Sequence, residues 1–251
     1  MTESAITLEG VSKRFGDVRA VIDLSLTVQR GEVFGFLGPN GAGKTTTIRM
    51  ITGLTRPDTG RVQLFGYDIE KDYIPARRQF AYIPDEGFLY PRMTGREFLA
   101  FLWVAHHQTS PDRRKIDEVL EMMGLSLWGD TLIEQYSHGM RQRLLFAAAL
   151  MRDVPLWIVD EPIIGLDPAA VRMVKRLFRA KADRGETVFM STHLLELAEA
   201  VCDRVAIIHR GRLIAVGDLA SIRRGQGGEP AALEEAFLRM TEDAARDRIS
   251  H

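Results

Sequence analysis

The segment Gly38-Pro39-Asn40-Gly41-Ala42-Gly43-Lys44-Thr45 has the residue types and the spacing of a phosphate-binding loop. It follows an apolar run at 33–37 and precedes an expected helix from about residue 43 to 53, the setting that such a loop requires. Its glycines let backbone N–H groups point at a phosphate, the helix N-terminus adds partial positive charge, and Lys44 adds a full charge. The expected phosphate ligands are Gly38, Asn40, Gly41, Ala42, Gly43, Lys44, Thr45 and Thr46, with the Thr45 hydroxyl also facing Mg²⁺. Kinases, GTPases and ATPases all use loops of this kind.

A pair of carboxylates, Asp160 and Glu161, follows a second apolar run at 156–159. Because the carboxyl ends of parallel strands meet at one edge of a sheet, we expect both side chains beside the phosphate loop. Asp160 can hold Mg²⁺ there, directly or through water. Glu161 can act on a water molecule aimed at a γ-phosphate, as a general base or by positioning it. The alternative is that this acidic pair only caps the following helix.

A third motif, Tyr136-Ser137-His138-Gly139-Met140, opens an expected helix and is followed by Arg141-Gln142-Arg143. Ser137 and the free N–H groups of that helix form an anion site, and Ser137 can cap the helix at the same time. With these motifs in this order, the chain resembles the ATP-binding cassette (ABC) ATPases over roughly residues 6–217. His138 and Met140 depart from the family's usual Leu-Ser-Gly-Gly-Gln and look like the form found in exporter-type members. The resemblance implies that Ser137 and Gly139 face the γ-phosphate of ATP held by another subunit.

Further residues take their expected roles from the resemblance. Phe15 matches the aromatic position that stacks on adenine, and His193 matches the histidine that contacts the γ-phosphate. Asp167, in Gly165-Leu166-Asp167, matches a loop that crosses the dimer interface. Asp85 stands where the family usually has a glutamine that touches Mg²⁺ or the attacking water, so we expect a catalytic and metal-binding role with a shorter, anionic side chain.

The resemblance implies an ATPase subunit that binds ATP and Mg²⁺ and forms a homodimer, or a heterodimer with a related cassette. Its expected partners are integral membrane permease subunits, through which it would drive substrate in the direction of export. Its expected location is cytoplasmic, on the inner face of the cell membrane. Two other hypotheses stay open. One is a module that binds nucleotide and docks but scarcely hydrolyses it, because of Asp85 and the altered Ser137 motif. The other is an ABC ATPase of DNA repair or translation, which the single phosphate loop and the lack of sustained heptads disfavour.

Composition narrows the class of protein further. The chain has 251 residues with 33 basic and 34 acidic side chains, a formal net charge of −1, which argues against a broad nucleic-acid-binding face. No run approaches the ~18 apolar residues that cross a bilayer, and the N-terminus lacks the pattern of a secretory signal, so we expect a soluble chain. The single cysteine, Cys202, fits a reducing compartment and is expected to be a small buried residue.

The apolar periodicity and the resemblance together predict an α/β fold. We expect a P-loop NTPase (RecA-like) core with a mostly parallel central sheet, an N-terminal antiparallel β-subdomain and an inserted helical subdomain. The strands expected from the sequence are 6–9, 24–28, 33–37, 156–159, 187–190 and 205–208. The helices expected after the first are one capped by Thr94 and Glu97, one from Ser110-Pro111 to Gly124, one from Ser137 to Arg152, one from Asp167 to about Gly185, and one over 233–241.

The expected domains follow from these elements. Residues 1–84 and 154–217 form two parts of the ATP-binding core, 85–153 the helical subdomain, and 218–251 a C-terminal tail with a hinge at 225–230 and a short helix. The expected loop Gly87-Phe88-Leu89-Tyr90-Pro91 carries apolar side chains. It is either a contact patch for the membrane partner or packed under the helical block.

Overall fold

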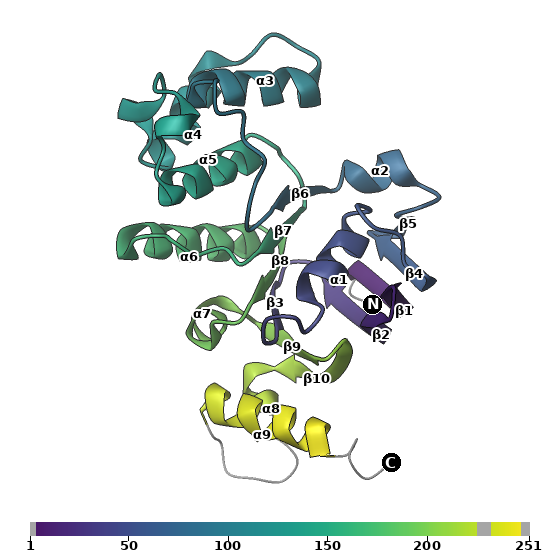
Figure 1. Ribbon diagram of the computed structural model, residues 1–251. Coiled ribbons are helices and arrows are strands. Elements are labelled where there is room, and N and C mark those ends of the chain that lie inside the picture. Colours follow the sequence, from purple (N-terminus) through teal and green to yellow (C-terminus); the bar gives the residue numbers. More distant parts are fainter. Residues whose placement is uncertain (1–3, 225–231, 247–251) are drawn as a thin grey trace.

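The structure is a computed structural model that describes residues 4–224 and 232–246 of the chain. Its central sheet has the order β10-β9-β3-β8-β7-β6 (Figure 1). The strands of this sheet are β3 (Val33–Leu37), β6 (Phe80–Ile83), β7 (Leu156–Asp160), β8 (Thr187–Thr192), β9 (Arg204–His209) and β10 (Arg212–Asp218). All neighbouring pairs are parallel except β9 with β10. The expectation of a mostly parallel central sheet is confirmed.

A second, antiparallel sheet has the order β2-β1-β4-β5. Its strands are β1 (Ser4–Phe15), β2 (Val18–Gln29), β4 (Thr59–Leu64) and β5 (Tyr67–Asp68). The long β1–β2 hairpin turns at Gly16, whose φ of 54° suits a residue without a Cβ atom. This sheet is the antiparallel N-terminal subdomain that we expected.

The two faces of the central sheet face two different hydrophobic cores. Along β3, Val33 and Leu37 join one core, whereas Phe34 and Phe36 join the other. The first core also contains side chains of α3 to α7, and the second contains those of β1, β2 and α1. Because successive side chains of a strand point to opposite faces, a strand buried on both sides is apolar throughout, and all five residues of β3 are buried.

The helices flank the sheet on both sides, and α3 to α5 form a separate group in the chain segment between β6 and β7 (Figure 1). Their bounds are α1 (Lys44–Ile51), α2 (Tyr73–Arg77), α3 (Gly95–His107), α4 (Arg113–Met122), α5 (His138–Leu150), α6 (Pro168–Asp183), α7 (Leu195–Val201), α8 (Leu219–Arg224) and α9 (Leu233–Arg246). Short 3₁₀ turns occupy Ser126–Trp128 and Ile133–Gln135. None of these described helices is long and apolar enough to cross a membrane. The division of the chain into domains stays a prediction.

Most expected helix boundaries are confirmed by the caps. Thr94 and Glu97 form the reciprocal capping box, Ser137 accepts from the Met140 N–H, and Asp167 accepts from the N–H groups at the start of α6. The expected start at Ser110-Pro111 is wrong, because Asp112 caps α4 through the Lys115 N–H. An aspartate directly after the proline is an equally good N-cap, and its carboxylate is the side chain that makes the bond.

The expected set of strands was incomplete, because the chain also forms β4, β5, β6 and β10. Edge strands such as β5, β6 and β10 are short or half-exposed, so their sequences lack the continuous apolar run that identified β3 and β7. The expected hinge at 225–230 lies outside the described residues, whereas the expected helix at 233–241 is part of α9. Cys202 is buried, as expected, with 8% of its surface exposed, and burial raises the pKa of its thiol.

Candidate functional site

The expected site residues meet at the carboxyl edge of the central sheet. Strands β3, β8 and β7 are neighbours, and each ends at a functional segment. The phosphate loop follows β3, His193 follows β8, and Glu161 follows β7. Since these strands are parallel, their carboxyl ends open onto the same crevice, the usual ligand site of open α/β sheets.

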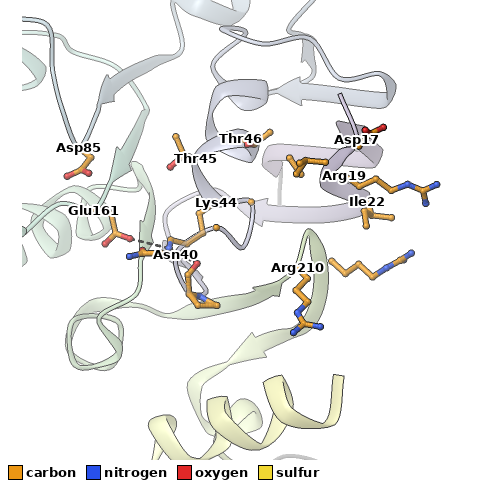
Figure 2. A pocket seen from close by; sticks show the side chains of 16 residues that line it. Asp17, Arg19, Ile22, Asn40, Lys44, Thr45, Thr46, Asp85, Glu161 and Arg210 are labelled. Atoms are coloured by element: carbon orange, nitrogen blue, oxygen red, sulfur yellow. Dashed lines mark hydrogen bonds and ion pairs between the residues drawn. The ribbon is translucent and has the colours of Figure 1, made fainter. Parts of the chain in front are cut away.

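A pocket of about 690 Å³ lies at this edge, a volume suited to a small-molecule ligand. Figure 2 shows the side chains that line it, with Lys44 in the middle and Glu161 and Asp85 on one side. The expected site residues among its lining are Asn40, Gly41, Gly43, Lys44, Thr45, Thr46, Asp85 and Glu161. The structure therefore brings the phosphate loop and two of the expected catalytic carboxylates together in one cavity.

The phosphate loop packs so closely against neighbouring backbone at two of its glycines that no larger residue fits there. Gly43 has a φ of 110°, and a Cβ atom there would lie 2.4 Å from the Ala20 carbonyl oxygen. Gly38 is packed equally closely against Ile208 of β9. Gly38 and Ala42 are buried and, unlike the other expected phosphate ligands of the loop, do not line the pocket.

Lys44 opens α1 and is almost fully buried, with 6% of its surface exposed. Its ammonium group donates to the carbonyl oxygen of Gly38 at 2.8 Å and lies 3.3 Å from Glu161 Oε1. A buried charge needs a partner, and here the loop carbonyls and Glu161 supply it. A phosphate group entering the pocket would take the place of the Glu161 carboxylate as the counter-ion of Lys44.

Glu161 is held in an unusual backbone conformation, with a φ of 47°, directly after β7. Strained, left-handed residues other than glycine concentrate at functional sites, where surrounding contacts hold them. Its Oε2 atom lies 3.0 Å from His193 Nδ1 and 3.4 Å from the His193 backbone N–H, while Oε1 faces Lys44. With 8% of its surface exposed, the Glu161 side chain lies between the His193 ring and the Lys44 ammonium and still lines the pocket.

The expected metal ligands lie around the same crevice. Asp160 is the last residue of β7, is 3% exposed and accepts a hydrogen bond from the Ser191 hydroxyl, which fixes its carboxylate. Thr45 and Asp85 line the pocket. Within residues 4–224 and 232–246, no group of three or more His, Cys, Asp or Glu side chains could hold a metal ion by itself. This donor set fits Mg²⁺, which typically binds one or two carboxylates or hydroxyls together with phosphate oxygens of the substrate.

Besides Gly38, Ala42 and His193, four expected nucleotide contacts do not line this pocket. They are Phe15, Ser137, Gly139 and Asp167. Phe15 ends β1, is 50% exposed and has the Lys13 ammonium 5.6 Å from the centre of its ring. Ser137 and Asp167 are exposed N-cap residues of α5 and α6. Within one chain these groups are therefore available to a ligand or partner that arrives from outside.

The N-terminus of α5 packs closely against the loop before α6. A Cβ atom on Gly139 would lie 3.0 Å from the Gly165 carbonyl oxygen, and one on Gly165 would lie 2.2 Å from the His138 ring. The bulky His138 thus occupies space beside Gly165, whose φ of 73° also favours glycine. The departure at His138 is accommodated by this contact and leaves the Ser137 end of the helix open.

Comparison with known proteins assigns the family. Residues 21–164 match the family model described as ABC transporter. The chain belongs to the ABC transporter family. It is 37% identical over 230 residues to the daunorubicin resistance ATP-binding protein DrrA3 of Streptomyces coeruleorubidus, covering 91% of this chain and 73% of that protein. The Nod factor export ATP-binding protein I of Burkholderia lata is 37% identical over 255 residues, covering 96% of this chain and 84% of that protein.

A solved structure of an ATP-binding subunit of an ABC transporter has the same fold. Its TM-score is 0.88 at 33% identity, with 95% of this chain and 100% of that chain covered. This chain is accordingly an ATP-binding subunit of the ABC transporter family, and it is an ATPase. Subunits of this family work with membrane permease components.

The ABC subunit also has pocket residues that we did not expect from its sequence. They lie in the β1–β2 hairpin, in β2 and at the β9–β10 turn, and they are Asp17, Val18, Arg19, Ala20, Ile22, Arg210 and Arg212. No motif marks them, because the β9–β10 turn approaches the phosphate loop only through the fold. The hairpin was detectable, since Phe15 and the Gly16-Asp17 turn precede an alternating segment, and the residues after Phe15 would follow it to the site.

The pKa of Asp85 in the ABC subunit predicts how the stability of the folded chain depends on pH. Burial, followed by the nearby carboxylates of Asp160 and Glu161, raises the pKa of Asp85 above its usual value. A raised pKa means that the folded chain binds this proton more tightly than the unfolded chain, so stability is lost as pH rises through that pKa. We expect Asp85→Asn to melt at a higher temperature than the parent at pH 7 without nucleotide, by a few degrees or less because the group is partly exposed.

The difference should shrink as pH falls below the ordinary range of aspartate, and differential scanning calorimetry across that range would measure it. Asp58→Asn is the matched control, because hydrogen bonds from Lys13 and the Arg14 N–H lower the pKa of Asp58 and its replacement should have the opposite sign. A lower melting temperature for Asp85→Asn at pH 7 would contradict the arrangement of the three carboxylates.

Proposed function

We propose that the chain is the ATP-hydrolysing subunit of an ABC exporter and that it works as a dimer with ATP bound between the two subunits. The observation that supports this best is the contact between Lys44 and Glu161, with His193 on the far side of the carboxylate. It places a phosphate-binding cation next to a carboxylate that can accept a proton from water. The export direction rests on the names of the relatives, which act in drug resistance and Nod factor export.

The proposed roles follow from position. Asn40, Gly41, Gly43, Lys44 and the threonines Thr45 and Thr46 bind the triphosphate, with backbone support from Gly38 and Ala42. Glu161 accepts the proton of the attacking water, and His193 holds Glu161 and contacts the γ-phosphate. Phe15 stacks on the adenine.

Mg²⁺ would be held by Thr45 and Asp160, with Asp85 beside it. When bound, it neutralises charge on the phosphate oxygens. Ser191 keeps the Asp160 carboxylate in place for this role. Burial, followed by the carboxylates of Asp160 and Glu161, raises the pKa of Asp85, and a cation bound nearby would lower it again.

The exposed N-termini of α5 and α6 are the proposed contribution of a second subunit. Ser137 and Gly139 offer free backbone N–H groups and a hydroxyl to the γ-phosphate, and Asp167 lies on the loop that meets the partner. Closure is then a population shift, because ATP binds two chains better than one. After hydrolysis the bridging γ-phosphate is gone, and the preference for the closed dimer goes with it.

A concentration series tests this dimer directly. Since each site needs groups from two chains, ATP turnover per molecule should rise with protein concentration until the dimer is saturated. Light scattering with nucleotide and a hydrolysis-blocked variant should show the doubled mass. Constant turnover per molecule from dilute to concentrated protein, with a monomer throughout, would contradict the proposal.

For the membrane partner we propose a contact that includes Phe88 and a groove between α2 and α3. Phe88 is 81% exposed and packs edge-on against Tyr90 at 5.3 Å, whereas Leu89 packs against the core. Leu89 thus packs as in the second sequence alternative, whereas the contact patch at Phe88 stays a prediction. A groove lined by Ile74, Tyr82 and His106 runs between α2 and α3 and is open to a partner segment.

Charge substitution at this position should uncouple transport from hydrolysis. In Phe88→Glu, we expect ATP consumption to continue while substrate movement per ATP falls several-fold, because a charge is buried poorly in an apolar contact. Transport into membrane vesicles, measured with ATP consumption, provides the ratio. Leu127→Glu is the matched control, since Leu127 is 95% exposed on another part of the surface. Full coupling in Phe88→Glu would exclude this patch as the contact.

A further inference from the structure

The nucleotide pocket continues beyond the phosphate loop into a region rich in arginine. Arg19 of β2 and Arg210 at the β9–β10 turn line it together with Arg212 of β10. In Figure 2, Arg19 and Arg210 lie on the side of Lys44 that is away from Glu161 and Asp85. If the γ-phosphate is near Glu161, the rest of the nucleotide must extend toward these arginines.

These side chains carry uncompensated positive charge. Among the described residues, no ion pair is formed by Arg19, Arg210 or Arg212, whereas the one acidic residue at this end, Asp17, pairs with Arg14. Guanidinium groups are planar and donate in a fixed fork, so they stack on aromatic rings and bind ring nitrogens or hydroxyl oxygens. A purine and its ribose offer all of these groups.

Arg210 and Gly211 form the two-residue turn between β9 and β10. Both residues have a positive φ, 47° and 78°, which is the backbone that a tight two-residue hairpin turn requires. This turn fixes the backbone of Arg210, whose side chain lines the cavity.

The turn that carries Arg210 is fixed to the site on two sides. The Gly211 N–H donates to the Ala42 carbonyl oxygen of the phosphate loop at 2.8 Å, and the Gly211 carbonyl accepts from the Ile22 N–H at 2.8 Å. A Cβ atom on Gly211 would lie 2.8 Å from the Ala20 carbonyl oxygen, so the turn rests directly on β2. Arg210 is therefore held in register with both the phosphate loop and the hairpin that carries Arg19.

We propose that Arg19 and Arg210 bind the nucleoside half of the nucleotide, its base and ribose, opposite the phosphate loop. This rests on the proposed binding of the triphosphate by Lys44 and its loop. The contact does not involve the γ-phosphate, so it contributes equally to binding of ATP and ADP and keeps ADP in the pocket after hydrolysis.

Calorimetric titration of the purified chain with ATP, ADP and inorganic tripolyphosphate separates this proposal from its alternatives. The variants are Arg19→Ala and Arg210→Gly, the latter because glycine fits the left-handed backbone and preserves the turn. We expect each to weaken ATP and ADP by the same factor, about 3- to 30-fold, the range of a cation–π or stacking contact. Tripolyphosphate, which lacks the nucleoside, should bind as it does to the parent.

The controls make each outcome decisive. Arg113→Ala removes an exposed arginine of α4 and should change none of the three affinities. Arg210→Lys keeps the charge but not the planar group and should behave like Arg210→Gly. Equal losses for tripolyphosphate, full recovery by lysine, or unchanged ATP affinity in both variants would each overturn the proposal. If the parent chain binds neither tripolyphosphate nor ATP, the proposed function itself is contradicted, and not only the role of the two arginines.

Discussion

Glu161→Gln should reduce ATP turnover by about 10²- to 10⁴-fold, the contribution typical of a general base, while ATP binding is kept or strengthened. Glutamine has nearly the same size and can still bond His193, but it cannot accept a proton from water. It also removes the negative charge 3.3 Å from the Lys44 ammonium, so a phosphate no longer has to displace that charge. The variant should therefore accumulate as an ATP-bound dimer.

Phosphate release and size-exclusion chromatography with ATP would measure both effects. Glu32→Gln is the matched control, because Glu32 is also buried and ion-paired, with Arg204 at 3.0 Å, but lies outside the pocket. Its turnover per folded molecule should equal that of the parent. Hydrolysis by Glu161→Gln at the parental rate would remove Glu161 from the chemistry.

Lys44→Ala should weaken the binding of ATP and ADP themselves, by about 10- to 100-fold, which corresponds to the loss of a charged hydrogen bond to phosphate. The loss also leaves the Glu161 carboxylate without its cation in a buried position, where it repels the incoming triphosphate. Because fewer sites then hold ATP, ATP turnover should also fall, and this fall should follow from the weaker binding of ATP.

Calorimetry with ATP and ADP checks this, and Lys181→Ala supplies the comparison. Lys181 is likewise buried and paired with a glutamate, Glu186, but it lies on α6 away from the pocket. Its replacement should lower the melting temperature without changing nucleotide affinity. Unchanged affinity in Lys44→Ala would contradict the assignment of the phosphate loop.

The sequence predicted the site well where one short segment fixes its own geometry. The loop from Gly38 to Thr45 and the N-cap residues Ser137 and Asp167 are local structures, and the structure shows the loop and both caps where they were expected. The apolar strand β3 was equally visible, because burial on both faces leaves no polar position in it. In each case the local structure is determined by residues that are adjacent in the sequence.

The sequence failed where distant segments meet. Arg210 reaches the pocket only because β9 pairs with β3 and its turn bonds to Ala42 and Ile22, and no local pattern contains that information. The contact between Lys44 and Glu161 likewise joins residues far apart in the chain. The strained backbone at Glu161 is a property of the folded chain, since it persists only under tertiary contacts.

A nucleotide shared by two chains is the central feature of the proposed mechanism, and disulfide trapping tests it directly. Cys202 is buried and its thiol pKa is raised, so cysteines introduced as Ser137→Cys and Asn40→Cys would react without interference from it. In a Glu161→Gln background, a mixture of the two single variants should form a covalent dimer with ATP and little without it. If no dimer forms with ATP, or if equal amounts form without nucleotide, the two chains do not enclose ATP between Lys44 and Ser137.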